Sequence, residues 1–206
     1  MGVKIRLLSW WTPNCFLKKG LHELANSTIN GLKELLIKEN PEYIEDLKGF
    51  EYNSNILKGN LHEQRRNMAA IHNQLVEKMI DIFGNEDAIK LGRKAMFIKG
   101  LALGREFRRI FGVGTSLEDL KSAARILYKV LGIEFVVKEF GNGEIVMVVN
   151  HCDLAEYYRP DTCKILSAAD EGVVQGLNPK IKIKFQERIT EGASCCLAPI
   201  HLEDNK

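Results

Sequence analysis

The chain has 206 residues and a mass of 23.3 kDa. Of these residues, 45% are hydrophobic and 27% are charged. These fractions are ordinary for a globular domain, so they exclude collagen-like, disordered and purely coiled-coil proteins. Lys and Arg number 29 against 27 Asp and Glu, which leaves a formal net charge of +2. That balance excludes an obligate nucleic-acid binder. No apolar run approaches the about 18 residues of a membrane span, so we expect no contact with a membrane.

The apolar stretch near the N-terminus is too short and too interrupted for a secretory signal. We therefore expect a cytoplasmic protein in a reducing compartment. Disulfides do not persist there, so the five cysteines are expected to be free thiols, metal ligands or catalytic groups.

The first part of the chain has the pattern of amphipathic helices. Apolar residues recur there at spacings of three and four, which places them along one side of a helix. The first helix should end before Asn40-Pro41, because a residue that precedes proline avoids helical backbone. Segment 41–60 is rich in Gly and Asn and is predicted to be a loop. Three more helices are predicted: from Leu61 to the capping Gly84, from Asn85 toward Phe107, and from the N-cap Ser116 to Leu131-Gly132.

The second part has the two-residue alternation of β-strands. Segments 133–140 and 144–149 are rich in β-branched residues and are joined by Gly141-Asn-Gly, which predicts a hairpin. A short helix is predicted over 162–174. Segments 180–185 and 194–200 predict a second hairpin, with lysines on its solvated face and a turn at 190–192.

The sequence therefore predicts an α+β fold, with N-terminal helices packed on a C-terminal antiparallel sheet of about four strands. The sheet consists of two hairpins joined by a helix. Residues 1–60 are expected to form a helical extension, and 61–206 the α+β body. In the third helix, Gly100 and Gly104 are spaced for close contact with another helix. The apolar surface of the N-terminal helices predicts a homodimer.

Four of the five cysteines lie near the ends of the C-terminal elements. We expect Cys152, Cys163 and one of Cys195 and Cys196 to converge, since neighbouring strand residues point to opposite faces. Three thiolates suit zinc or another thiophilic metal with one open position. The spacing leaves three roles open: small buried hydrophobic residues, metal ligands, or a catalytic thiolate.

Cys163 falls in the first turn of the predicted helix 162–174, where the helix dipole lowers the pKa of a thiol. Asp170 lies two turns further along the same face, about 10 Å away. The two side chains are therefore expected to line one wall, along which a small substrate can lie.

The C-terminal region resembles the signature of the L-2-amino-thiazoline-4-carboxylic acid hydrolase-like family. The residues that carry this resemblance are Asp161-Thr-Cys163, Asp170, Gly176-Leu-Asn178-Pro179 and Glu191-Gly192-Ala-Ser-Cys195-Cys196. The order of hairpin, helix and hairpin is similar to that of 4-vinyl-reductase-type small-molecule-binding domains. The resemblance assigns the family's closing cysteine to Cys196. The chain departs from the family pattern after Cys152, where a proline is often found.

The resemblance implies an enzyme that hydrolyses a C–N bond of a small cyclic amidine, in which water attacks an sp² carbon. The resemblance implies that Asp170 acts as the base, that Asn178 orients the substrate and that His151 carries a proton. It also implies that the cysteines bind a metal or supply a thiolate: Cys152, Cys163 and Cys196. The alternative is a non-catalytic module that binds a metal or a hydrophobic or tetrapyrrole-like small molecule between the helices and the sheet.

Overall fold

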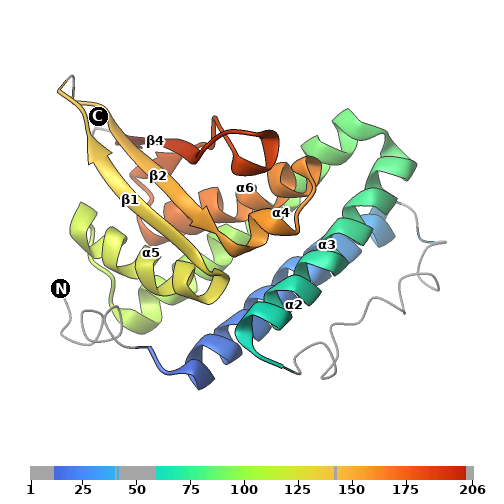
Figure 1. The fold of residues 1–206 in the computed structure, drawn as a ribbon, viewed down its shortest axis with the longest axis horizontal. Helices are drawn as coiled ribbons and strands as arrows, with labels where there is room; N and C mark the ends of the chain where they lie inside the picture. The colour runs from blue at the N-terminus through green and yellow to red at the C-terminus, as the bar shows by residue number, and fades with distance from the viewer. Residues whose placement is uncertain (1–11, 40, 42–58, 142, 203–206) are drawn as a thin grey trace.

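The apolar stripes of the first half form long helices, and the alternating segments of the second half form strands (Figure 1). The computed structural model describes residues 12–39, 41, 59–141 and 143–202. The helices are α2 (Asn14–Glu39), α3 (Leu61–Phe83), α4 (Asn85–Phe111), α5 (Leu117–Leu131) and α6 (Pro160–Leu177). The strands are β1 (Ile133–Glu139), β2 (Ile145–Cys152), β3 (Ile181–Ile183) and β4 (Cys196–Leu202), with single 3-10 turns η3 (Asp153–Glu156) and η4 (Ile189–Glu191).

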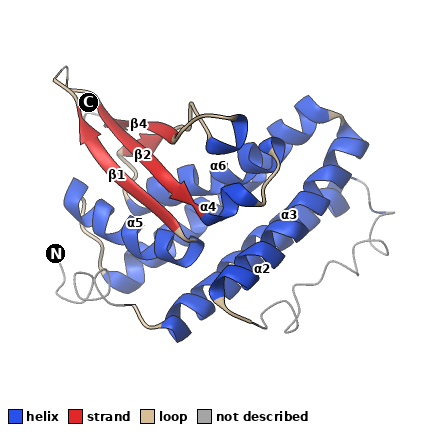
Figure 2. Cartoon of the chain, viewed as in Figure 1, coloured by secondary structure: helices blue, strands red, loops and turns tan. Residues whose placement is uncertain are grey.

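The predicted α+β fold is confirmed. The four strands form one antiparallel sheet in the order β1-β2-β4-β3. Figures 1 and 2 show α4, α5 and α6 between this sheet and the pair formed by α2 and α3. One continuous core joins all of them, from Leu21 in α2 to Ala198 in β4. Among the described helices, none is both long and apolar enough to cross a lipid bilayer.

Local signals in the sequence fix most helix ends. Ser116 accepts a hydrogen bond from the Asp119 amide at 3.1 Å, which caps the start of α5. At the other end of α5, Gly132 has a left-handed φ of 69°, which costs glycine little. Most of the predicted loop 41–60 lies outside the described residues.

The second hairpin differs from its prediction. Strands β3 and β4 are neighbours, with Ile183 opposite Ile200, but no tight turn joins them. The turn predicted at 190–192 is part of η4, and a bridge between Glu187 and Leu197 closes the connection. Arg188 lies in this connection, and its buried side chain contacts α6 through Ser167.

Helices α4 and α6 pack backbone to backbone because both carry glycines at the contact. A Cβ atom at Gly100 would fall on the carbonyl oxygen of Ala169, and one at Gly172 on that of Phe97. The two helices run in the same direction, since Gly92 faces Ile165 whereas Gly104 faces Val173 and Gly176. The close contact predicted from the glycine spacing is thus confirmed, and α6 is its partner.

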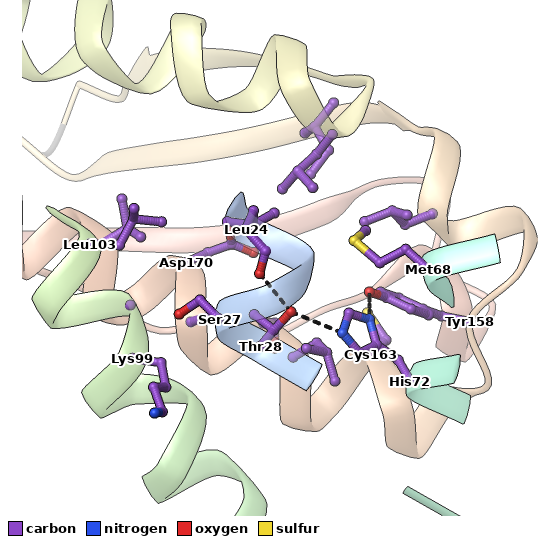
Figure 3. A pocket seen from close by; sticks show the side chains of 18 of the residues that line it. Leu24, Ser27, Thr28, Met68, His72, Lys99, Leu103, Tyr158, Cys163 and Asp170 are labelled. Atoms are coloured by element: carbon purple, nitrogen blue, oxygen red, sulfur yellow. Dashed lines mark hydrogen bonds between the residues drawn. The ribbon is translucent and has the colours of Figure 1, made fainter. Parts of the chain in front are cut away.

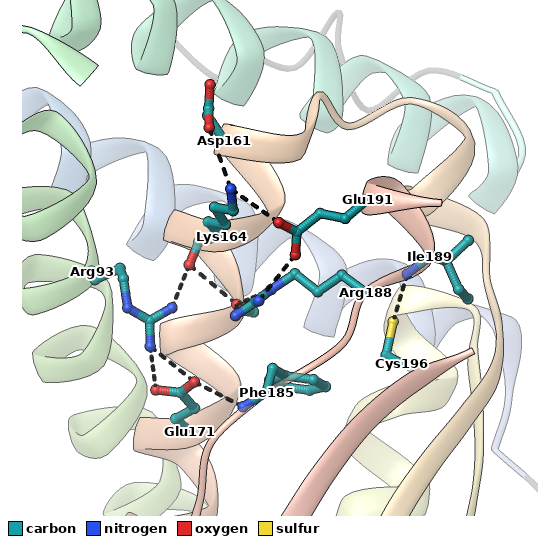
Figure 4. Close-up of polar contacts among 10 residues, drawn as sticks. Arg93, Asp161, Lys164, Glu171, Phe185, Arg188, Ile189, Glu191 and Cys196 are labelled. Carbon is teal, nitrogen blue, oxygen red and sulfur yellow. Dashed lines mark hydrogen bonds and ion pairs between the residues drawn. The ribbon is translucent and has the colours of Figure 1, made fainter. Parts of the chain in front are cut away.

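Charged contacts fix α6 on its other sides (Figure 4). Arg93 of α4 donates to both carboxylate oxygens of Glu171 at 2.9 and 2.7 Å. Glu171 also accepts from the Phe185 amide at 3.3 Å, which ties the segment after β3 to the helix. The buried Arg188 donates to Ser167 at 3.3 Å. These contacts hold α6 in a defined position, which matters because α6 carries Cys163 and Asp170.

The homodimer stays a prediction. Exposed apolar side chains that such an association would cover include Phe16, Ile98, Ile110 and Val136. Sedimentation at micromolar concentration tests it.

Candidate functional site

A cavity of about 80 Å³ lies between α2, α3, α4 and α6, next to the end of β2 (Figure 3). We call it the polar cavity after the hydroxyl, imidazole, thiol and carboxyl groups in one part of its wall; most of its surface is apolar. Those groups belong to Ser27, Thr28, His72, Cys152, Tyr158, Cys163, Ser167 and Asp170, and Lys99 also lines the cavity.

The carboxyl group of Asp170 lies in the wall of the polar cavity. It makes no hydrogen bond or ion pair with any described residue, and its neighbours in the cavity wall include Leu24, Leu103 and Val173. Burial raises the pKa of Asp170 from 3.8 to about 7, and the adjacent Glu171 carboxylate adds to the rise. A carboxyl group that exchanges its proton near neutral pH is suited to acid–base catalysis.

Cys152 and Cys163 line the same cavity as Asp170. The expectation that the helix dipole lowers the pKa of Cys163 is wrong. Burial dominates and raises that pKa to about 11, although a hydrogen bond with Thr190 lowers it in part. Burial likewise raises the pKa of Cys152 to about 12. At neutral pH both groups are therefore thiols, which donate weak hydrogen bonds and are poor nucleophiles.

We expect iodoacetamide at neutral pH to modify the exposed Cys15 well before Cys163. The reagent reacts with thiolate, and burial keeps Cys163 protonated and covered. Peptide mapping by mass spectrometry over a time course measures the order. Modification of Cys163 first would show that its thiolate forms readily.

The other cysteines do not extend this group into a metal site. Cys196 is the buried member of its pair, and its sulfur accepts a hydrogen bond from the Ile189 amide at 3.4 Å (Figure 4). It does not line the polar cavity, whereas Cys152 and Cys163 do. Within the described ranges, no three Cys, His, Asp or Glu side chains are placed to hold a metal ion. Among the described residues, the predicted zinc ligands Cys152, Cys163 and Cys196 are therefore not placed to hold a metal ion together.

A buried hydrogen-bond chain forms one end of the polar cavity (Figure 3). The Thr28 hydroxyl lies 2.9 Å from Nε2 of His72, and Nδ1 of His72 lies 2.8 Å from the Tyr158 hydroxyl. Thr28 donates its proton to the Leu24 carbonyl at 2.9 Å, so it accepts from His72. His72 in turn accepts from Tyr158, which fixes the imidazole as the neutral Nε2–H tautomer.

Replacement of His72 by Gln should remove a dependence of stability on pH. Burial lowers the pKa of His72 from 6.5 to about 3. As the pH falls below about 6.5, His72 binds a proton in the unfolded chain but not in the folded chain, so the wild type loses stability. Between pH 7 and pH 5 the loss should be about 2 kcal/mol larger for the wild type than for His72→Gln. Urea unfolding at both pH values measures it, and equal losses would refute the assignment.

His151 and Asn178 lie outside both cavities. His151 is exposed, and its Nε2 lies 2.8 Å from Asp153, which is also ion-paired with Arg65. Asn178 is the C-cap residue of α6 and donates to the Thr115 carbonyl at 2.9 Å. Both residues have structural partners in these places, and we carry neither into the proposed mechanism.

A second, larger cavity of about 390 Å³ lies between α2, α4, α5 and α6. We call it the apolar cavity, because most of its wall consists of aliphatic and aromatic side chains. Five residues line both cavities and form the wall between them: Leu24, Leu103, Leu131, Asp170 and Val173. Asp170 is the ionisable residue among these five.

Sequence reasoning missed the hydrogen-bond chain and Lys99, which lines the polar cavity and pairs with Glu34 at 2.7 Å. The sequence does contain a signal for His72. His72 lies between Met68 and Leu75 in the apolar stripe of α3, and an imidazole within a buried stripe needs polar partners.

Several solved structures are similar to this chain. No curated protein matches the chain. One structure is of subunit 3 of the trafficking protein particle complex from Naegleria fowleri, covalently bound to palmitic acid. It shares the fold at 16% identity and a TM-score of 0.53, and the match covers 68% of this chain and 95% of that one. The phenol-responsive sensory domain of the transcription activator PoxR matches at 17% identity and a TM-score of 0.48, over 65% of this chain and 73% of its own.

An H-NOX protein from S. oneidensis matches at 15% identity and a TM-score of 0.46, over 86% of this chain and 99% of its own. A family profile gives the specific assignment. The profile of L-2-amino-thiazoline-4-carboxylic acid hydrolase matches residues 64–198, well over half of the chain. That range includes His72, Cys152, Tyr158, Cys163 and Asp170. The chain therefore belongs to the L-2-amino-thiazoline-4-carboxylic acid hydrolase family.

Proposed function

We propose that the protein hydrolyses a C–N bond of a small cyclic amidine in the polar cavity, with Asp170 as the general base. The observation that carries this proposal is the unpaired carboxyl group of Asp170, which lines the cavity and has a pKa of about 7. Membership of the family supports the class of reaction.

In the proposed reaction, the Asp170 carboxylate takes a proton from water as the water oxygen bonds to the amidine carbon. The C=N electron pair moves to nitrogen, which gives a tetrahedral intermediate. The protonated Asp170 then gives its proton to the leaving nitrogen and the C–N bond breaks. A C=O bond forms as the hydroxyl proton of the intermediate passes to the released nitrogen. The carboxyl group ends the cycle ionised, so the reaction needs water alone as co-reactant.

Two neighbouring groups assist in this proposal. The Cys163 thiol is protonated at neutral pH and donates a hydrogen bond to the leaving nitrogen. The Tyr158 hydroxyl donates a hydrogen bond to His72, so its oxygen can accept a hydrogen bond from an N–H group of the substrate. His72 is a positioning residue here, since it acts only through Tyr158.

Incubation with L-2-amino-thiazoline-4-carboxylic acid in heavy-oxygen water tests the proposal. Mass spectrometry should show a product that has gained one water and carries one labelled oxygen. 2-Amino-thiazoline without the carboxyl group, run in parallel, shows whether the amidine alone suffices. If both compounds bind, as calorimetry reports, and neither reacts, the protein is a binding module and the proposed hydrolysis is wrong.

A further inference from the structure

The proposed chemistry leaves the apolar cavity without a role. At about 390 Å³ it falls within the roughly 300–1,000 Å³ that is usual for small-molecule sites. Side chains from four helices form its wall, and the deepest of them, such as Leu131, Val174 and Leu177, are buried.

Two polar groups that have no hydrogen-bond partner among the described residues line the apolar cavity. One is the Asp170 carboxyl group, and the other is the hydroxyl of Tyr128. Tyr128 is only 5% exposed, and no described residue forms a hydrogen bond with its hydroxyl. The hydroxyl is therefore open to a hydrogen bond with a molecule in the cavity. The ring itself is fixed by edge-to-face packing against Phe135, with centroids 5.2 Å apart.

The outer end of the cavity opens to solvent between α2 and α4. Lys19, Glu23 and Glu106 line it there and are exposed, as are Phe16 and Ile110, which are 39% and 61% exposed. Lys19 and Glu23 form an ion pair with each other at 3.9 Å. The lining of the cavity thus combines exposed charged side chains, apolar walls and the polar groups of Asp170 and Tyr128.

We infer that the apolar cavity binds an apolar substituent of the substrate, an aliphatic chain or an aromatic ring, while the amidine head lies in the polar cavity at Asp170, which lines both cavities. This inference rests on the proposed function. The N–H groups of an amidine are donors for the Asp170 carboxylate. The substrate class is therefore a cyclic amidine that carries an apolar group.

Calorimetry with acetamidine, hexanamidine and decanamidine hydrochlorides at about pH 8 tests this substrate class. Each methylene that enters the cavity should increase the affinity roughly three- to fourfold until the cavity is full. Leu127→Trp, which places an indole in the apolar cavity from α5, should abolish that increase. Leu35→Trp is the matched control, because Leu35 is a half-buried residue that lines neither cavity. It should keep the increase.

Affinities that stay flat along the series in the wild type would overturn the inference, and so would equal effects of the two Trp variants. A photoreactive diazirine at the end of the decanamidine chain locates the bound chain in the wild-type protein, without any substitution. It should label peptides of α4, α5 or α6 that line the apolar cavity, and labelling elsewhere would contradict the inference. A flat series together with hydrolysis of L-2-amino-thiazoline-4-carboxylic acid would leave the proposed function standing, which distinguishes the two failures.

Discussion

Asp170→Asn should lower turnover of a cyclic amidine roughly 10²–10⁴-fold, the usual contribution of a general base. The amide keeps the shape of the side chain but cannot take a proton from water. Steady-state rates at saturating substrate measure the loss. Turnover of the wild type should also fall as the pH drops below about 7, because the carboxyl group becomes protonated.

The same variant should be more stable than the wild type above pH 7. The pKa of Asp170 is raised by folding, so between pH 3.8 and about 7 the unfolded chain releases a proton that the folded chain retains. The wild type loses free energy of unfolding over that range, and Asp170→Asn does not. At pH 8 the variant should gain roughly 2–4 kcal/mol, which urea unfolding measures.

Asp161→Asn is the matched control on the same helix. Asp161 lies at the surface, 3.9 Å from Lys164 and 3.0 Å from Asn85. Its replacement should change neither turnover nor stability by much, since exposed ion pairs contribute little. Wild-type turnover in a folded Asp170→Asn protein would refute the assignment of the base.

Gly172→Ala should destabilise the protein by roughly 3 kcal/mol or more. The added methyl group would fall on the Phe97 carbonyl oxygen and crowd the Leu101 amide, both of which are backbone atoms of α4. Side-chain rotation cannot relieve such a clash, so the two helices must separate. Urea unfolding at neutral pH measures the loss.

Gly141→Ala is the control for the substitution itself. Gly141 has no atom within reach of an added methyl group and no left-handed φ. It should lose less than about 0.5 kcal/mol. Similar stabilities of the two variants would mean that α4 and α6 do not pack as closely as described.

Much of the fold follows from local signals. The helix that begins at Ser116 and the hairpin 133–149 are fixed by caps, alternation and glycine turns, which act over a few residues. The connection between β3 and β4 could not be predicted in the same way. Its course depends on Arg188, whose partner Ser167 lies 21 residues earlier in the chain, and sequence spacing does not show such a contact.

The candidate site was predictable only in part. Asp170 and Cys163 share one face of α6, so helical spacing places them together. The chain of Thr28, His72 and Tyr158 joins residues 44 and 86 positions apart, and only the packing of α2, α3 and the loop before α6 brings them together. The raised pKa of Cys163 was missed because the helix dipole is a local effect, whereas burial is a property of the whole fold.

The titration of Asp170 itself tests the central claim most directly. Carboxyl carbon resonances of the wild type, labelled at aspartate and compared with those of Asp170→Asn, identify its signal. The unpaired, buried carboxyl group described here should titrate with a midpoint near pH 7, and the rate of amidine hydrolysis should follow the same midpoint. A midpoint near 3.8, the ordinary value for aspartate, would contradict the assignment of Asp170 as the base.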